Sequence, residues 1–166
     1  MDIIETERLH ISLMNIGDAA FMMELMNTQS WLTFIGDRNI RTLEAARLYV
    51  QAILDRDDAS YYIVRTREDH TPAGVLSFLQ RTYLPGKDLG FAFLPSFQGK
   101  GYALESASAL LDTLKVDHER ILATTFPGNS RSIRLLELLG FRYHSTFRQD
   151  ETELHLYEFF NEQDHF

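Results

Sequence analysis

The pattern of hydrophobic and polar residues divides the chain into short strands and amphipathic helices. A period of two, or a short β-rich apolar run, predicts strands over seven segments: 8–14, 61–65, 74–81, 88–94, 121–126, 142–147 and 153–160. A helical period predicts four helices, which follow Asp18, follow Thr42, span 103–116 and follow Asn129. Residues 27–40 have no convincing period and are predicted to form a loop with large apolar side chains.

Helices and strands are mixed along the chain but do not alternate regularly, which is typical of the α+β class. We predict a single domain over residues 1–166, with one mixed, mostly antiparallel sheet flanked by four helices. The segments 61–65, 74–81 and 88–94 are expected to form an antiparallel meander. The strands on either side of the 103–116 helix are expected to be parallel, joined by a right-handed crossover.

The run from residue 88 to residue 112 changes from a strand to a helix through a glycine-containing turn. Gly90 and Ala92 leave one strand face nearly bare, and Pro95 ends the strand because proline has no N–H to donate. Gly99 and Gly101 then precede the helix and let the backbone approach a bulky anion. A helix start presents unpaired N–H groups and partial positive charge, so this turn is a candidate phosphate site.

Composition narrows the possible partners and chemistry. The net charge of −8 argues against nucleic acid or an anionic membrane as a partner. The chain has no cysteine, which excludes disulfides and a cysteine nucleophile, and its six histidines lack metal-ligand spacing, so no metal is expected. The stretch Met1–Glu5 lacks a signal-peptide pattern and no apolar run is long enough to span a membrane. We therefore predict a soluble, cytoplasmic protein.

Two common nucleotide motifs fit the turn poorly. The P-loop pattern G-x-x-x-x-G-K-S/T fails because Gly101 follows Lys100. The dinucleotide pattern G-x-G-x-x-G has Leu104 at its third glycine, and the strand at 121–126 ends without an acidic residue for a ribose. A dinucleotide oxidoreductase is therefore a weak alternative.

A third motif fits: residues 98–103 match Q-x-x-G-x-A, the acyl-coenzyme A pyrophosphate loop of the GNAT N-acyltransferase superfamily. E-T-E-R-L at 5–9, D-L-G-F-A-F-L-P at 88–95 and P-G-N-S-R-S-I-R-L-L-E-L-L-G-F at 127–141 follow in the expected order. With them the chain resembles the branch of ribosomal-protein N-terminal (RimJ/RimL-like) acetyltransferases.

The resemblance implies how acetyl-CoA binds. The sheet would splay between the strands at 88–94 and 121–126, and the pantetheine arm would lie in that gap. Gln98 would contact the phosphates or brace the loop, whereas Glu105 is expected to have a structural role at the helix start. The coenzyme-binding residues implied by the motif are Phe93, Leu94, Gln98, Gly99, Lys100, Gly101, Tyr102, Ala103 and Asn129.

The resemblance also implies a mechanism in which an amine attacks the thioester directly in a ternary complex, consistent with the missing cysteine. A backbone N–H near Phe93 or Leu94 would stabilise the oxyanion. Asn129 would hold the coenzyme near its sulfur or simply cap its helix. Ser132 matches the position proposed in this branch as the thiolate's partner or acid. The chain departs from the many superfamily members that use a tyrosine on this helix, since none occurs between residues 127 and 140. Tyr143 is a weaker candidate, expected in the core.

The general base is open. Asp88 begins its strand at a position where the branch often has an acid, although an exposed strand-end aspartate is the plainer interpretation. His10, His155 and Glu158 are further candidates.

The resulting hypothesis is an N-acetyltransferase that moves an acetyl group from acetyl-CoA to a primary amine, either a protein N terminus or a small molecule. The alternative is a non-catalytic acyl-CoA sensor or interaction module on the same fold. We expect a monomer or a homodimer.

Overall fold

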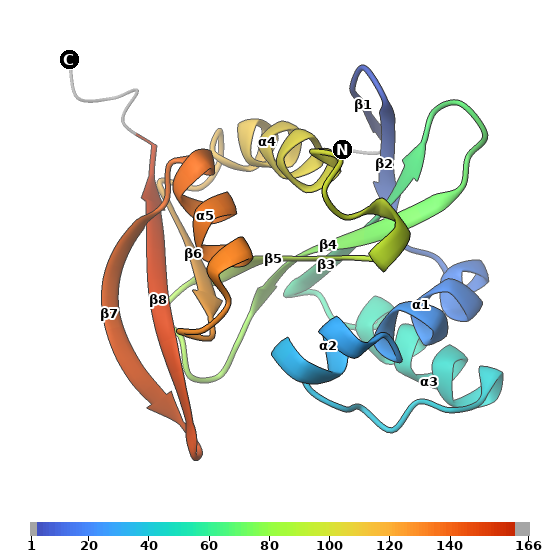
Figure 1. Ribbon diagram of the computed structural model, residues 1–166, viewed down its shortest axis with the longest axis horizontal. Coiled ribbons are helices and arrows are strands. Elements are labelled where there is room, and N and C mark those ends of the chain that lie inside the picture. The colour runs from blue at the N-terminus through green and yellow to red at the C-terminus, as the bar shows by residue number, and fades with distance from the viewer. Residues whose placement is uncertain (1–2, 162–166) are drawn as a thin grey trace.

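The computed structural model describes residues 3–161, which form one eight-stranded sheet with helices on both faces (Figure 1). The strand order is β1-β2-β3-β4-β5-β6-β8-β7. The strands are β1 Ile3–Glu5, β2 Leu9–Leu13, β3 Ala59–Thr66, β4 Pro72–Gln80, β5 Lys87–Phe93, β6 Arg120–Thr125, β7 Arg142–Gln149 and β8 Thr152–Phe160. All seven predicted strands are present, and β1 is an addition that was not predicted.

The predicted domain and the Met1–Glu5 stretch include residues 1–2, and the domain also includes 162–166. These seven residues lie outside the described part of the chain, so the single-domain organisation stays a prediction. None of the helices within 3–161 is long and apolar enough to cross a membrane.

The sheet formed by residues 3–161 is mixed, as predicted, and its single parallel pairing joins β5 and β6. In the described residues these two strands share one register pair, Asp88 with Leu122, at the beginning of β5. All other neighbouring strands are antiparallel and pair over most of their length. The end of β5 that leads to the glycine turn is therefore paired with β4 but not with β6.

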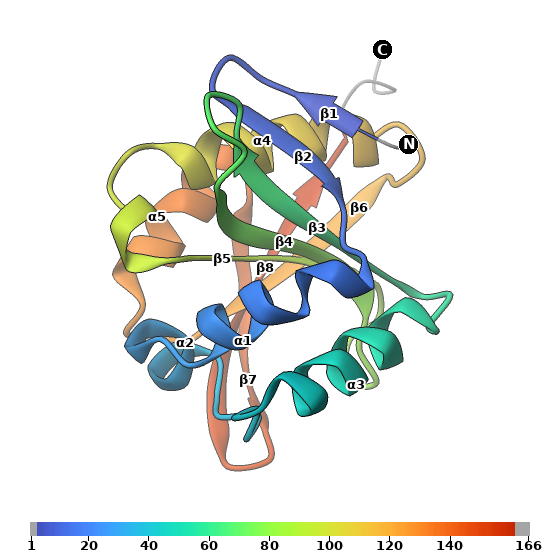
Figure 2. The ribbon, with the colours of Figure 1, turned by 90° about the vertical axis from the view of Figure 1, so that its right-hand side faces the viewer.

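Within residues 3–161, five α-helices and two short 3-10 helices cover the sheet. Helices α4 and α5 lie over one face, and α1, α2 and α3 lie over the other (Figure 1, Figure 2). The helices are η1 Ile16–Asp18, α1 Ala19–Met26, α2 Gln29–Phe34, α3 Leu43–Leu54, η2 Pro95–Phe97, α4 Tyr102–Leu114 and α5 Ser130–Leu139.

The prediction of four helices was wrong by one, because α2 lies in the stretch expected to be a loop. It has only six residues, and Trp31 is its one buried side chain, so no repeating apolar stripe marks it in the sequence. Its start is instead fixed locally: the Thr28 hydroxyl accepts the Trp31 N–H at 3.3 Å.

Local helix signals were otherwise reliable. Thr42 and Asn129 each accept a backbone N–H in the first turn of their helices, and Gly140 ends α5 with φ +99°. The cap predicted at Asp18 differs, because Asn15 caps η1 first and the Asp18 carboxylate accepts the Asn15 N–H at 2.9 Å.

Strand β5 belongs to both cores of the protein. Leu89 and Phe93 pack into the core under α4 and α5, whereas Ala92 packs against the core under α1–α3. Because side chains alternate along a strand, Asp88 and Gly90 face the same way as Ala92. One face of β5 thus meets the glycine-turn helix, and the other meets the N-terminal helices.

Candidate functional site

The turn before α4 has the backbone shape of an anion site. Gly99 and Gly101 both have left-handed backbones, with φ of +76° and +80°. Helix α4 begins directly after Gly101, and no side chain caps it. Its first N–H groups are therefore unpaired within the helix and available to an anion. The predicted helix start, Ala103, is displaced by one residue.

The Gln98 side chain connects this turn to two neighbouring elements. Its Nε2 donates to the Phe93 carbonyl at 3.0 Å, and its Oε1 accepts from Arg131 Nη1 at 2.6 Å. The side chain thus joins the end of β5 to the first turn of α5. Of the two roles left open for Gln98 by the sequence, the contacts match the bracing one. Lys100 is exposed, with its ammonium 5.5 Å from the centre of the Phe97 ring.

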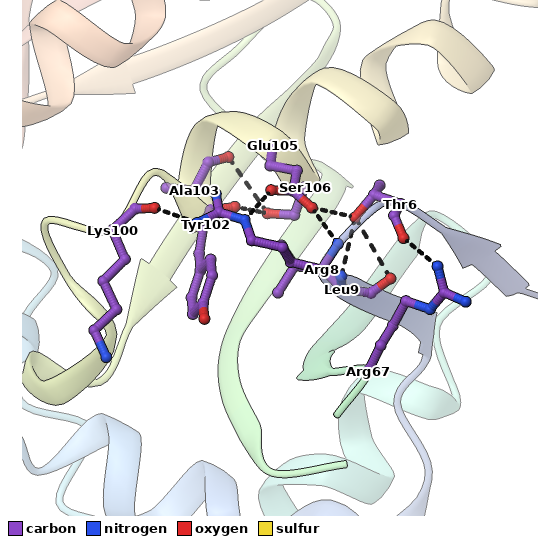
Figure 3. A network of polar contacts seen from close by, with 9 residues as sticks. All are labelled: Thr6, Arg8, Leu9, Arg67, Lys100, Tyr102, Ala103, Glu105 and Ser106. Atoms are coloured by element: carbon purple, nitrogen blue, oxygen red, sulfur yellow. Dashed lines mark hydrogen bonds and ion pairs between the residues drawn. The ribbon is translucent and has the colours of Figure 1, made fainter. Parts of the chain in front are cut away.

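Side chains of the N-terminal segment hydrogen-bond to the glycine turn and to the first turn of α4 (Figure 3). Arg8 donates through Nη1 to the Lys100 carbonyl at 2.8 Å and through Nε to Glu105 at 2.7 Å. Its guanidinium carbon lies 4.7 Å from the centre of the Tyr102 ring. The Thr6 hydroxyl adds a 2.5 Å hydrogen bond to Glu105. The structural role expected for Glu105 agrees with these contacts, but the part played by Thr6 and Arg8 was missed.

The same contacts keep Glu105 ionised. Burial alone would raise the pKa of this carboxyl, but the hydrogen bonds from Thr6 and Arg8 outweigh it and hold the pKa below its ordinary value. Arg8 and Glu105 therefore form an ion pair in addition to their hydrogen bonds.

The backbone of β5 offers donors toward β6. Leu94 donates its N–H to the Ala73 carbonyl at 2.9 Å, on the β4 side. Since N–H directions alternate along an antiparallel pair, the N–H groups of Phe91 and Phe93 point to the opposite side, where β6 diverges. Of the two oxyanion donors named from the sequence, the Leu94 N–H is already used and the Phe93 N–H faces the opening.

Asn129 and Ser132 lie together at the start of α5. Asn129 accepts the Ser132 N–H through Oδ1 at 3.2 Å, so it caps the helix. Its Nδ2 and the Ser132 hydroxyl form no hydrogen bond with any residue in 3–161 and remain available to a ligand. The amide can therefore cap the helix and donate at the same time. Tyr143 was expected in the core, which is wrong: it is 54% exposed.

Asp88 is not the exposed strand-end aspartate of the plainer interpretation, because it is only 2% exposed. Both of its oxygens face Arg81 Nε, at 3.1 and 3.2 Å. Burial raises the pKa of Asp88, and the Arg81 guanidinium partly opposes that increase.

The other candidate bases are dispersed. His10 lies on β2, three strands from β5, beside His70 and Glu5. Glu158 is paired with Arg120 at 2.8 Å. His155 lies opposite Thr125 near the end of β6, and its buried Nδ1 has no partner among the described residues. Among residues 3–161, no group of three or more His, Asp or Glu side chains is arranged to hold a metal ion.

Comparisons with known proteins match residues 8–142 to the acetyltransferase (GNAT) domain. YnaD of Bacillus subtilis (strain 168), named an uncharacterized N-acetyltransferase, is 28% identical over 148 residues, which is 88% of this chain and 86% of YnaD. The ribosomal L7/L12 alpha-N-protein acetyltransferase RimL, solved with coenzyme A, has a TM-score of 0.85 at 20% identity, covering 98% of this chain and 100% of that one. The ribosomal-protein-S5-alanine acetyltransferase from Vibrio fischeri has a TM-score of 0.83 at 19% identity and covers 98% of both chains.

Proposed function

Because the chain belongs to the acetyltransferase (GNAT) domain family, we propose that it transfers an acetyl group from acetyl-CoA directly to a primary amine. The amine is that of a protein N terminus or of a small molecule. The observation that carries the proposal is the uncapped start of α4 behind two left-handed glycines, beside the point where β5 and β6 diverge. This arrangement supplies backbone donors for a pyrophosphate and for a thioester in one place.

The donor side follows from the backbone. The N–H groups of residues 99–103 would bind the pyrophosphate, and the pantetheine arm would lie along the free edge of β5. The Phe93 N–H, which faces that edge, would donate to the oxyanion as the carbonyl carbon becomes tetrahedral. Gln98 keeps the end of β5 and the turn in fixed relation.

On the acceptor side, the neutral amine attacks the carbonyl carbon, a C–N bond forms, and the C–S bond then breaks. The amine loses one proton and the departing thiolate gains one. Ser132, whose hydroxyl is free beside the cap of α5, is the proposed proton donor or hydrogen-bond partner for the sulfur. Asp88 was predicted as the base; because it lies five positions before Phe93 on β5, it would act only through a chain of waters. Its 2% exposure means that an amine would not contact it directly.

The alternative is an acyl-CoA sensor without catalysis, and two measurements separate it from the transferase. Isothermal titration should detect acetyl-CoA binding by the wild type but not by Gly101→Val, because valine is strained at φ +80° and its Cβ would lie 3.3 Å from the Arg8 guanidinium. Coenzyme A release with a panel of amines should then exceed the rate without amine. Binding without such release would identify a sensor, and no binding at millimolar acetyl-CoA would refute the proposal.

The cytoplasmic location, the monomeric or homodimeric state and the absence of nucleic-acid and membrane partners stay predictions. They rest on the sequence alone.

A further inference from the structure

Arg81 and Asp88 form a buried ion pair on the face of β5 that lies opposite the α4 helix. Arg81 directly follows β4, and its backbone carbonyl accepts from the Gln80 side chain at 3.0 Å, which stiffens the hairpin. Its Nε faces both Asp88 oxygens. Asp88 pairs in register with Leu79, and its side chain lies on the side of the sheet that α1–α3 cover.

The two partners differ in what a ligand can reach. The Asp88 side chain is 3% exposed, whereas that of Arg81 is 31% exposed. The two terminal nitrogens of Arg81, Nη1 and Nη2, form no hydrogen bond with any residue of 3–161. Asp88 thus fixes the guanidinium through Nε and leaves the outer fork open. A planar fork with two parallel donors matches a carboxylate.

The surroundings of Arg81 also favour an anion. Tyr61 on β3 stays protonated, because burial raises its pKa to about 12, with a further increase from Tyr49 and smaller opposing effects from Arg81 and Arg38. Its hydroxyl is therefore a donor at neutral pH. Arg38 acts electrostatically on the Tyr61 hydroxyl and forms no ion pair within the described residues, so it adds a positive charge near Tyr61. The whole chain, in contrast, carries a net charge of −8.

The position along β5 sets the distance from the reacting centre. Asp88 precedes Phe93, whose N–H is the proposed donor to the oxyanion, by five positions. At a rise of about 3.3 Å per residue, the Arg81–Asp88 pair lies roughly 17 Å from that point along the strand. The carboxylate of a free α-amino acid is too close to its own amine to span this distance. An extended peptide advances about 3.3–3.6 Å per residue, so a side chain at its fourth or fifth position reaches Arg81.

We propose that Arg81, held by Asp88 and assisted by Tyr61 and Arg38, binds a carboxylate of the acceptor, and that the acceptor is a peptide N terminus with an acidic residue at position four or five. This inference rests on the proposed transferase function and specifies its acceptor. Asp88 is then a positioning residue for Arg81, whatever its part in proton transfer.

The test compares two amidated hexapeptides that differ by one charge, Ala-Ala-Ala-Asp-Ala-Ala and Ala-Ala-Ala-Asn-Ala-Ala. Coenzyme A release at saturating acetyl-CoA should give a kcat/KM at least ten-fold higher for the aspartate peptide, the size expected for one good charged contact. Arg81→Gln should reduce that ratio to about one. Free aspartate and free alanine form a second arm and should both be poor acceptors.

Arg56→Gln is the matched control. Arg56 lies at the base of the same hairpin, where it donates to the Gln80 carbonyl at 2.9 Å and pairs with Asp58, and its loss removes one positive charge without touching Arg81. The aspartate preference should survive this change. Asp88→Asn separates two roles: loss confined to the aspartate peptide indicates positioning, whereas an equal loss of kcat for both peptides assigns Asp88 to proton transfer alone and contradicts the positioning role.

Three results would overturn the inference: equal kcat/KM for both peptides in the wild type, a preference unchanged in Arg81→Gln, or a preference lost in Arg56→Gln. If Arg81→Gln does not fold, Arg81→Lys and the salt dependence of the wild-type preference replace it. Titration of the coenzyme A-saturated protein with the two peptides distinguishes a failure of the proposed anion site from a failure of the proposed transferase function. Selective aspartate binding without transfer would support the anion site and refute the transferase, and transfer without selectivity would do the reverse.

Discussion

Replacing Arg8 with alanine should weaken coenzyme binding, although Arg8 lies on the side of the turn opposite the proposed pyrophosphate site. The Lys100 carbonyl points at Arg8, and in a trans peptide the carbonyl and the following N–H point in opposite directions. Holding the Lys100 oxygen therefore aims the Gly101 N–H away from Arg8 and toward the front of the turn, where the pyrophosphate is proposed to bind. Arg8 also keeps a carbonyl dipole from turning toward the anion. It is thus a positioning residue.

The magnitude follows from its contacts. A hydrogen bond to a charged group contributes about 1.5–3 kcal/mol when buried, and Arg8 is 44% exposed, so about half of that is reasonable. The exposed ion pair with Glu105 adds about 0.2–1 kcal/mol. The sum of these two contributions includes about 1.4 kcal/mol. If the coenzyme must supply about 1.4 kcal/mol to order the turn in Arg8→Ala, the Kd for coenzyme A rises roughly ten-fold. The strand itself should persist, because Leu9 and Ile11 are fully buried.

Isothermal titration of coenzyme A against Arg8→Ala, Arg8→Lys and Arg67→Ala tests this prediction. Lysine has one terminal nitrogen and cannot serve both the Lys100 carbonyl and Glu105 with the fixed geometry of arginine, so it should rescue only part of the affinity. Arg67 bonds the Thr6 carbonyl in the same segment but not the turn, and its loss should leave Kd unchanged. A folded Arg8→Ala protein with wild-type Kd would refute the positioning argument, and so would an equal loss in Arg67→Ala.

Two further predictions concern Glu105 and Ser132. The pKa of Glu105 is lowered from 4.5 by its bonds to Thr6 and Arg8, so its contribution to stability is full above pH 4.5 and is lost as the pH falls through the folded-state pKa. The difference in Tm between wild type and Glu105→Gln should accordingly be constant from pH 5 to 7 and shrink below 4.5; a difference that grows in acid would reverse the assigned sign. Ser132→Ala should lower kcat about ten-fold or more with little change in coenzyme Kd, because the hydroxyl is free while the backbone N–H makes the cap contact. Wild-type kcat would remove Ser132 from the mechanism.

Sequence reasoning succeeded where structure is decided within a short window. The glycine turn, the caps at Thr42 and Asn129 and the left-handed Gly140 each depend on residues within four positions of one another. Helix α2 was missed because six residues with one buried side chain carry no period. The family motif indicated that residues 5–9 belonged with the turn, but nothing in one sequence pairs Arg8 with Glu105, which is 97 residues away.

Asp88 shows a different limit. Its predicted position at the start of a strand is correct, but the plainer expectation for a charged strand end was that its side chain would be exposed. A partner was in fact readable from the hairpin: with Leu79 opposite Asp88, Arg81 follows the end of β4 and reaches back across the turn. Register, rather than composition, would have identified the pair.

The two faces of β5 explain why the sequence indicates a donor but not an acceptor. The proposed donor site is made of backbone N–H groups, which any sequence with glycines at 99 and 101 presents in the same way. The proposed acceptor site is made of side chains from β3, the β4–β5 hairpin and the segment before α3, which meet only in the folded protein. These side chains touch neither the turn nor Arg8. Substitutions at Tyr61 or Arg81 should therefore alter the preference among amines while leaving the coenzyme Kd unchanged, and the acceptor can vary within this fold without disturbing the donor.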